Sequence, residues 1–226
     1  MASADFRERL LAGLGGPWPE PCDLKPRQRA APEQKDGYRI ESFTYEVEPG
    51  DAVPALLLVP DGVSAQSPAP AVAVWHQHNG EYHLGKNEPA GLAGNPMHHT
   101  GVALAKEGYV VLCPDALCFE ERQDPTGKLK NRNSKESALF ERFEFLRYVV
   151  AGKSLAWKNV LDMRRAIDFL VSRPEVKRDR LGCYGHSMGS MHAEDKFTWY
   201  IEDGTGHVLS PEMWQRTRAC FKKHLT

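Results

Sequence analysis

The amino-acid sequence predicts an α/β sandwich with a mainly parallel sheet, and three observations lead to this. Short runs of small and β-branched apolar residues, typical of strands buried on both faces, recur along the chain. Segments with helical spacing of apolar residues alternate with these runs. The chain has 226 residues, of which 41% are hydrophobic and 26% charged, as expected for one soluble domain with a buried core.

Composition and charge exclude several classes of function. The net charge of −1 creates no strong field, so we expect neither nucleic acid nor membrane as a partner. No apolar stretch reaches the ~18 residues of a membrane helix, and the first residues do not resemble a secretory signal. The five cysteines have no CxxC spacing, which indicates reduced thiols and a cytoplasmic location. The sequence does not indicate the oligomeric state.

The first part of the chain divides into an N-terminal segment and the start of the domain. Apolar spacing over 5–14 predicts a short helix, and the prolines that follow predict an extended arm. We therefore assign 1–37 to this helix and arm, and 38–226 to the α/β domain. Two antiparallel strands are expected over 38–60, joined by a turn at Pro49, Gly50 and Asp51.

The remaining elements follow in alternation. Further strands are expected at 69–75, at 109–113 and at "RLGCYGHS", with a helix ending at Gly108 before the second of them. The charged segment 119–150 is longer than an ordinary connection and is a candidate cap or lid insertion. A helix containing Val160 and Ile167 follows it, and Ser210 is predicted to cap a terminal helix that starts at Pro211.

A G-x-S-x-G pattern runs from Gly185 to Gly189. It directly follows a predicted strand, and its glycines leave room for a sharp turn. In such a turn the serine backbone is strained and the hydroxyl projects above the sheet. This predicts Ser187 as a nucleophile. The alternative is a Gly-rich turn with an incidental serine.

A serine hydroxyl needs a base within hydrogen-bond reach. The best candidate is His207, in a Gly-rich loop between a predicted strand, Phe197 to Ile201, and the terminal helix. The alternative for His207 is a surface histidine in a turn. His186 adjoins the serine, so its ring is expected to point elsewhere and to line the pocket or pack.

An oxyanion hole requires two hydrogen-bond donors. The backbone N–H of Met188, the residue after the nucleophile, is the first candidate. The second is expected from the loop after the strand at 69–75, where the N–H of Gln77 or His78 is the candidate.

The same loop offers a rival interpretation as a metal site. His76, His78 and His83 are spaced H-x-H-x4-H, with His98 and His99 downstream. Histidines grouped in this way can bind zinc. No carboxylate follows at the spacing of metal-hydrolase signatures, so we expect these side chains to line a polar pocket mouth and no metal to be bound.

Five segments, in this order over roughly 38–226, resemble α/β-hydrolase serine esterases of the dienelactone hydrolase and acetyl xylan esterase kind. They read VWHQHNGEYHLGKNEPAGLAGNP, GYVVLCPDALCFEER, GKSLAWKNVLDMRRAIDFLVSRPEV, RLGCYGHSMGS and DGTGHVLSPEMW. The resemblance implies an α/β-hydrolase-like three-layer sandwich. It also implies hydrolysis of small carboxylic esters or lactones through Ser187 and His207, with no metal or organic cofactor.

The sequence departs from this family after the nucleophile. In the family a helix, strand, helix and strand precede the histidine strand, and the catalytic acid follows one of those strands. Here Ser187 and His207 are 20 positions apart, which predicts a sheet shortened by about two strands near His192. We hypothesise that the strand from Phe197 to Ile201 docks directly beside the nucleophile strand.

No residue of this segment is therefore assigned as the catalytic acid. Asp195, Glu202 and Asp203 lie in the remaining segment, and Asp203 matches a turn-forming aspartate better than an acid of the family. Asp115 is expected to fix a loop. Loss of a triad acid lowers kcat by about 10⁴ without abolishing catalysis. The prediction is a serine esterase of reduced activity, and the alternative is an inactive truncated hydrolase or binding remnant.

Overall fold

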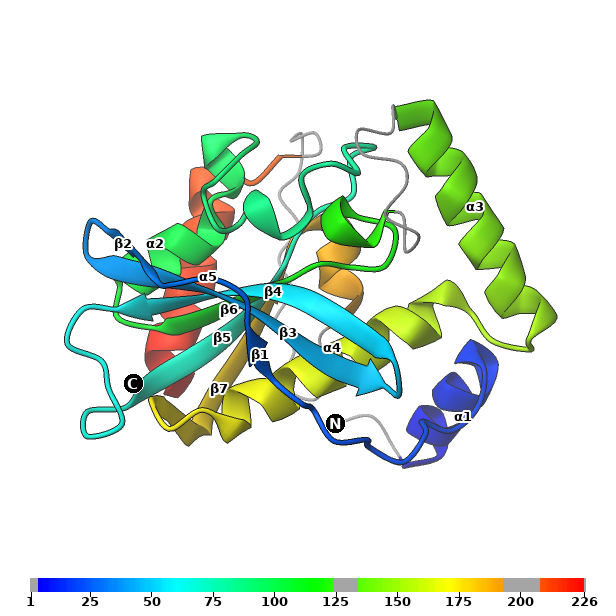
Figure 1. The fold of residues 1–226 in the computed structure, drawn as a ribbon, viewed down its shortest axis with the longest axis horizontal. Coiled ribbons are helices and arrows are strands. Elements are labelled where there is room, and N and C mark those ends of the chain that lie inside the picture. Colours follow the sequence, from blue (N-terminus) through cyan, green and yellow to red (C-terminus); the bar gives the residue numbers. More distant parts are fainter. Residues whose placement is uncertain (1–3, 124–133, 193–207, 226) are drawn as a thin grey trace.

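A seven-stranded sheet lies at the centre of the molecule (Figure 1). The computed structural model describes residues 4–123, 134–192 and 208–225. The strands are β1 (Arg27–Gln28), β2 (Glu33–Lys35), β3 (Tyr38–Glu48), β4 (Asp51–Pro60), β5 (Ala69–Trp75), β6 (Val110–Pro114) and β7 (Val176–Gly185). The helices are α1 (Ala4–Leu14), α2 (Thr100–Lys106), α3 (Ser134–Val150), α4 (Leu155–Ser172) and α5 (Pro211–Leu225), with short 3-10 turns η1 (Gly85–Asn87), η2 (Pro96–His98), η3 (Glu120–Arg122) and η4 (Ser187–His192).

The strand order is β1-β3-β4-β6-β5-β7, and β2 also pairs with β3. Strand β5 runs parallel to β6 and β7, whereas the other four pairings are antiparallel. The predicted α/β sandwich is confirmed, and the described part of its sheet is mixed rather than mainly parallel. All the antiparallel pairings involve the first four strands, β1 to β4. Strands β3 and β4 form a hairpin that turns at Gly50, whose φ is 81°.

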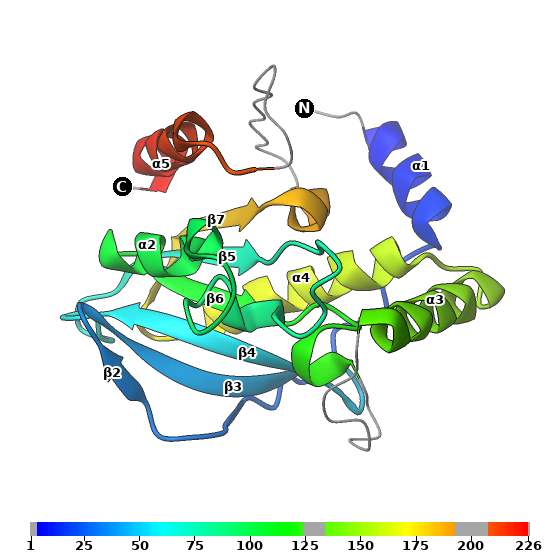
Figure 2. The same cartoon turned by 90° about the horizontal axis from the view of Figure 1, so that it is seen from above.

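Helices cover both faces of the sheet (Figure 2). On one face α4 buries Leu161 and Phe169 against the sheet, and the Phe169 ring stacks on Tyr45 with 5.1 Å between centroids. On the other face α2 and α5 contribute Leu104 and Phe221 to a second apolar cluster. The central strands contact both clusters, which explains their nearly continuous apolar sequences.

Serine side chains cap the first turns of two helices, α5 and α4. The Ser210 hydroxyl accepts the N–H of Met213 at 3.1 Å, so the predicted cap of α5 is confirmed. Ser154 caps α4 in the same way, by accepting the N–H of Trp157 at 3.0 Å. Within the described ranges, no helix is both long and apolar enough to cross a membrane.

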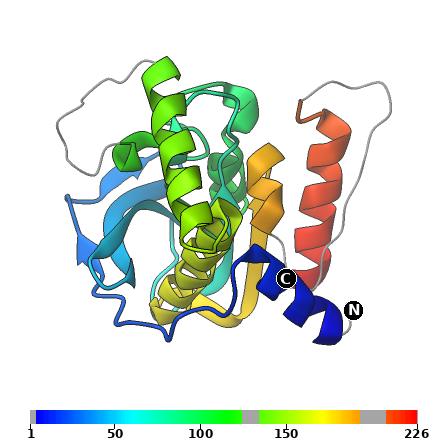
Figure 3. The ribbon, with the colours of Figure 1, turned by 90° about the vertical axis from the view of Figure 1, so that its right-hand side faces the viewer.

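Strand β7 pairs only with β5 among the described strands. In Figure 3 it lies between the yellow-green α4 and the red α5. The predicted strand from Phe197 to Ile201 lies outside the described residues, so its docking beside β7 stays a prediction.

Candidate active site

Ser187 is separated from the end of β7 by one residue, His186, and begins η4. Its φ is 57°, in the left-handed region that non-glycine residues rarely adopt. A strand that ends in a serine with this backbone, followed by a helical turn, is the strained corner that the GHSMG segment predicts. The N–H of Gly189 donates to the carbonyl of His186 at 3.0 Å and closes the turn.

Gly189 allows η4 to lie against the end of β5. A Cβ atom at this position would come within 2.6 Å of the carbonyl oxygen of Trp75. The parallel register also pairs Trp75 with Gly185. The loop that begins at His76 and the turn that carries Ser187 therefore leave the sheet side by side.

The candidate oxyanion donors come from these two adjacent segments. No backbone acceptor in the described part of the chain receives the N–H of Gln77, His78 or Met188. The Met188 side chain packs against Tyr82 and Phe119, which form a small cluster beside the turn. The roles of these N–H groups as oxyanion donors stay predictions.

His76 is a buried structural residue. Its Nε2 accepts the N–H of Ala116 at 3.1 Å, and its Nδ1 lies 2.8 Å from the carbonyl oxygen of Gln77. The first contact requires a neutral ring protonated on Nδ1, which then donates to Gln77. Burial lowers the pKa of His76 to about 4, so the ring stays neutral at pH 7.

The next two side chains of this loop are also held. The amide of Gln77 donates to Glu88 at 3.1 Å. The Nδ1 of His78 accepts the N–H of Gly80 at 3.0 Å, and its Nε2 lies 3.0 Å from a carboxylate oxygen of Glu141. Both ring nitrogens of His76 and His78 are thus engaged by protein groups, which argues against the rival interpretation of these histidines as zinc ligands.

A small cavity lies beneath this loop, lined by His76, Gln77, Glu88, His98 and His186 among others. The rings of His98 and His186 stack with 5.2 Å between centroids. The expectation that His186 lines a pocket is confirmed for this cavity.

Asp115 fixes a loop, as predicted. Its carboxylate accepts the backbone N–H of Lys86 at 2.8 Å and pairs with the ammonium of Lys86 at 2.7 Å. Glu120 and Glu121 also contact this ammonium. These three carboxylates are the one group in the described residues with the spacing of a cation site, and the Lys86 ammonium occupies it. Complete burial raises the pKa of Asp115 to about 7, against the opposing effect of Lys86.

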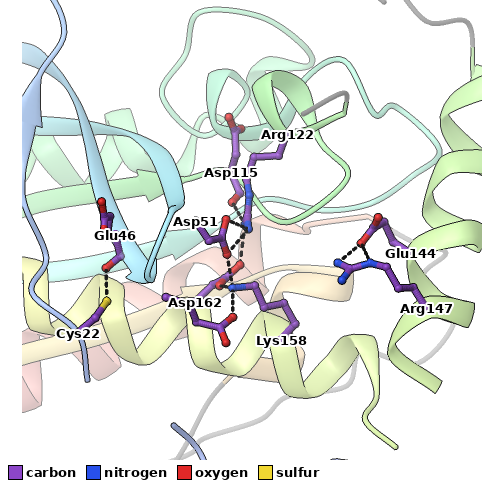
Figure 4. Close-up of polar contacts among 10 residues, drawn as sticks. Cys22, Glu46, Asp51, Asp115, Arg122, Glu144, Arg147, Lys158 and Asp162 are labelled. Atoms are coloured by element: carbon purple, nitrogen blue, oxygen red, sulfur yellow. Dashed lines mark hydrogen bonds and ion pairs between the residues drawn. The ribbon is translucent and has the colours of Figure 1, made fainter. Parts of the chain in front are cut away.

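A second network consists of Asp51, Arg122, Lys158 and Asp162 (Figure 4). Arg122 pairs with Asp162 at 2.6 Å and donates to the carbonyl of Asp115 at 3.2 Å, which joins the two networks. Lys158 pairs with Asp162 at 2.8 Å and also contacts Asp51. Burial opposes the charge of Arg122, but the carboxylates of Asp162 and Asp51 raise its pKa overall.

The sequence analysis missed Lys86, Arg122, Glu141 and the Lys158–Asp162 pair. One signal was available for the pair, because the two residues lie four positions apart on the helix face that also carries Leu161. Lys86 and Glu141 have no such signal, since their partners are 29 and 63 residues away.

The base and the acid candidates cannot be placed in the same way. His207, Asp195, Glu202 and Asp203 lie outside the described residues, so the assignment of His207 as the base stays a prediction.

Comparison with known proteins identifies the class. The family model described as "Dienelactone hydrolase family" matches residues 54–197. The chain therefore belongs to the dienelactone hydrolase family, and the resemblance on which the sequence analysis relied is confirmed.

The chain is also similar to two individual proteins. It is 28% identical over 164 residues to "Putative hydrolase YtaP" of Bacillus subtilis (strain 168), a match that covers 71% of this chain and 49% of the relative. It shares its fold, with a TM-score of 0.62 and 19% identity, with the crystal structure of a putative acetyl xylan esterase from Bacteroides fragilis NCTC 9343. That match covers 82% of this chain and 46% of the other, so the chain spans about half the length of both relatives.

Proposed function

We propose that this chain hydrolyses carboxylic esters of small molecules, including lactones, with Ser187 as the nucleophile. The observation that carries the proposal is the left-handed backbone of Ser187, φ 57°, at the end of a strand in a chain of the dienelactone hydrolase family. The family description, which names the hydrolysis of a lactone, supports esters as the substrate class.

In the proposed reaction the Ser187 oxygen attacks the carbonyl carbon of the ester, and His207 takes the hydroxyl proton. The N–H of Met188, together with that of Gln77 or His78, donates to the developing oxyanion. Collapse of the tetrahedral intermediate breaks the bond to the alkoxide, which leaves as the alcohol with the proton from His207. Water then hydrolyses the acyl-serine by the same steps.

The proposed activity is lower than that of a complete triad. No carboxylate of the described residues is assigned as the acid, and Asp115 is held by Lys86. A serine–histidine pair without its acid loses a factor of about 10⁴ in kcat but retains measurable turnover.

A fluorophosphonate probe tests the proposal, because it reacts only with an activated serine. We expect slow, stoichiometric labelling of the wild-type chain, seen as a mass increase located at Ser187. Labelling should be absent in Ser187→Ala, and reduced at least ten-fold in His207→Ala. A folded wild-type chain that does not react overturns the proposal.

The second candidate is a chain without catalysis, either an inactive truncated hydrolase or a binding remnant. It is favoured by one observation, namely that the chain spans about half the length of its relatives. Absence of labelling together with binding of a small ester, detected by calorimetry, would support it.

A further inference from the structure

Helix α3 presents polar groups to the rest of the protein. Ser137 and Glu144 are buried on its inner side, whereas Leu139, Phe143 and Leu146 are at least half exposed. The Ser137 hydroxyl donates to the side-chain carbonyl of Gln123 at 3.1 Å. The helix is therefore attached through specific hydrogen bonds as well as through apolar contacts.

Glu141 makes the central attachment. Its carboxylate lies 3.0 and 3.1 Å from the Nε2 of His78 and accepts the hydroxyl of Tyr82 at 2.7 Å. Because the Nδ1 of His78 accepts the N–H of Gly80, the proton of the neutral ring is on Nε2 and is donated to Glu141. Both edges of the His78 ring are fixed, and the carboxylate holds two groups of one loop.

The same contacts reach the turn of the candidate nucleophile. The ring of His78 meets those of Tyr82 and Phe119 edge-on, with centroids 5.0 and 5.1 Å away. Tyr82 and Phe119 stack on each other and pack against Met188, the residue after Ser187. One cluster thus touches both segments that supply the candidate oxyanion donors.

We propose that Glu141 is a positioning residue, which orients His78 and Tyr82 and thereby fixes the spacing between the His76–His78 loop and the N–H of Met188. This inference depends on the proposed function. Glu141 does not contact the reacting atoms, and its effect passes through the loop. The N–H donors of an oxyanion hole stabilise the negative charge that develops on the ester carbonyl oxygen in the transition state. If these donors are misplaced, the chemical step becomes slower and kcat falls, while substrate binding changes little.

The pKa shifts of His78 and Glu141 agree with the hydrogen bond between them. The hydrogen bond to Glu141 raises the pKa of His78, although burial opposes it. Burial raises the pKa of Glu141, but the bonds from His78 and Tyr82 outweigh this and lower it overall. Tyr82 and His76 are titratable neighbours of His78. Burial and the hydrogen bond to Glu141 raise the pKa of Tyr82, whereas burial lowers the pKa of His76 to about 4.

The test compares Glu141→Ala and Glu141→Gln with a matched control. Glu144→Gln makes the same change of charge three residues further along α3, where the carboxylate pairs with Arg147. Hydrolysis of a small aryl ester is measured per active site, counted by the fluorophosphonate probe, so that loss of folded protein does not affect the rate. The titration of His78 is followed by NMR.

We expect kcat per active site to fall roughly ten- to a hundred-fold in Glu141→Ala, with little change in KM. The midpoint of the His78 titration should fall in Glu141→Gln. Glu144→Gln should match the wild type in both measurements.

The outcomes separate the two proposals. If the wild type reacts and Glu141→Ala turns over equally fast per site, the positioning role is wrong and the proposed function stands. An unchanged His78 midpoint in Glu141→Gln also overturns the inference. A wild type that never reacts overturns the function and, with it, the positioning role.

Discussion

Ser187 adopts a backbone conformation that costs energy and is therefore maintained by its surroundings. A non-glycine residue at φ 57° costs about 1–3 kcal/mol, which the packing of neighbouring segments must offset. Gly189 provides part of that packing, because it lets η4 approach the end of β5 to a distance no side chain would permit. The sequence predicts this turn correctly because its requirement for small residues is local.

Replacing Gly189 by alanine should destabilise the protein by about 1–3 kcal/mol, because the added Cβ would clash with the Trp75 carbonyl oxygen at 2.6 Å. Urea unfolding measures the change. The matched control is Gly13→Ala, in α1, where an added Cβ meets nothing within 4 Å and helix propensity favours alanine. Equal midpoints for Gly189→Ala and the wild type would contradict the prediction.

At the scale of elements, two loops interlock around a buried lysine. The loop after β5 carries Lys86, and the loop after β6 carries Asp115 and Glu120. The N–H of Glu120 also donates to the carbonyl of Tyr82 at 2.7 Å. Glu120 itself has a φ of 41°, so this second loop is held in a strained form by contacts with the first.

Lys86→Met should destabilise the protein by about 3–5 kcal/mol, because it leaves the carboxylate of Asp115 buried without its partner. Lys106→Met is the matched control. It removes an ammonium that pairs with exposed Asp36 on the surface, and we expect no measurable effect on stability. Denaturant unfolding of both variants checks the prediction, which fails if the two variants are equally stable.

Strand β7 is the last strand of the sheet among the described residues, and its first half carries charged side chains. Lys177, Arg178, Asp179 and Arg180 are all exposed, and charged side chains on an edge strand disfavour pairing between molecules. The second half, from Leu181 to Gly185, leads to the candidate nucleophile and has no charged residue. If the predicted strand from Phe197 to Ile201 did not dock there, this second half would present an apolar edge that invites aggregation.

At the scale of the whole molecule, folding fixes the ionisation of groups that would titrate freely in the unfolded chain. His76 is the clearest case, with its pKa lowered by burial from the ordinary 6.5 to about 4. Between these values the unfolded chain binds a proton that the folded protein does not. The contribution of His76 is thus complete above pH 6.5 and is lost as the pH falls towards 4.

The free energy of unfolding should therefore decrease by about 3 kcal/mol on this account between pH 7 and pH 4. His76→Gln retains an acceptor for the N–H of Ala116 but cannot be protonated, so its stability should decrease less over the same range. Urea unfolding at intervals across this range measures both slopes. Parallel curves for the two proteins would show that His76 does not titrate in this way.

The sequence by itself determined strands β3 to β7, helices α1, α2, α4 and α5, and the corner at Ser187, but not β1 and β2, which lie in the segment predicted as a helix and arm. These features depend on interactions between residues that are close in sequence, so the sequence alone predicts them. Examples are the apolar periodicity, the helix start at Ser210 and Pro211, and the glycines of GHSMG. The resemblance to the dienelactone hydrolase family added the expectation of a three-layer sandwich.

Only the tertiary structure decided which polar groups meet. Lys86 contacts Asp115 because β5 and β6 are neighbours in the sheet and bring the loops that follow them to one edge. Glu141 contacts His78 because the inner side of α3 meets the loop after β5. The buried pair of Lys86 and Asp115 joins two positions 29 residues apart, and neither position carries a local pattern that indicates the other.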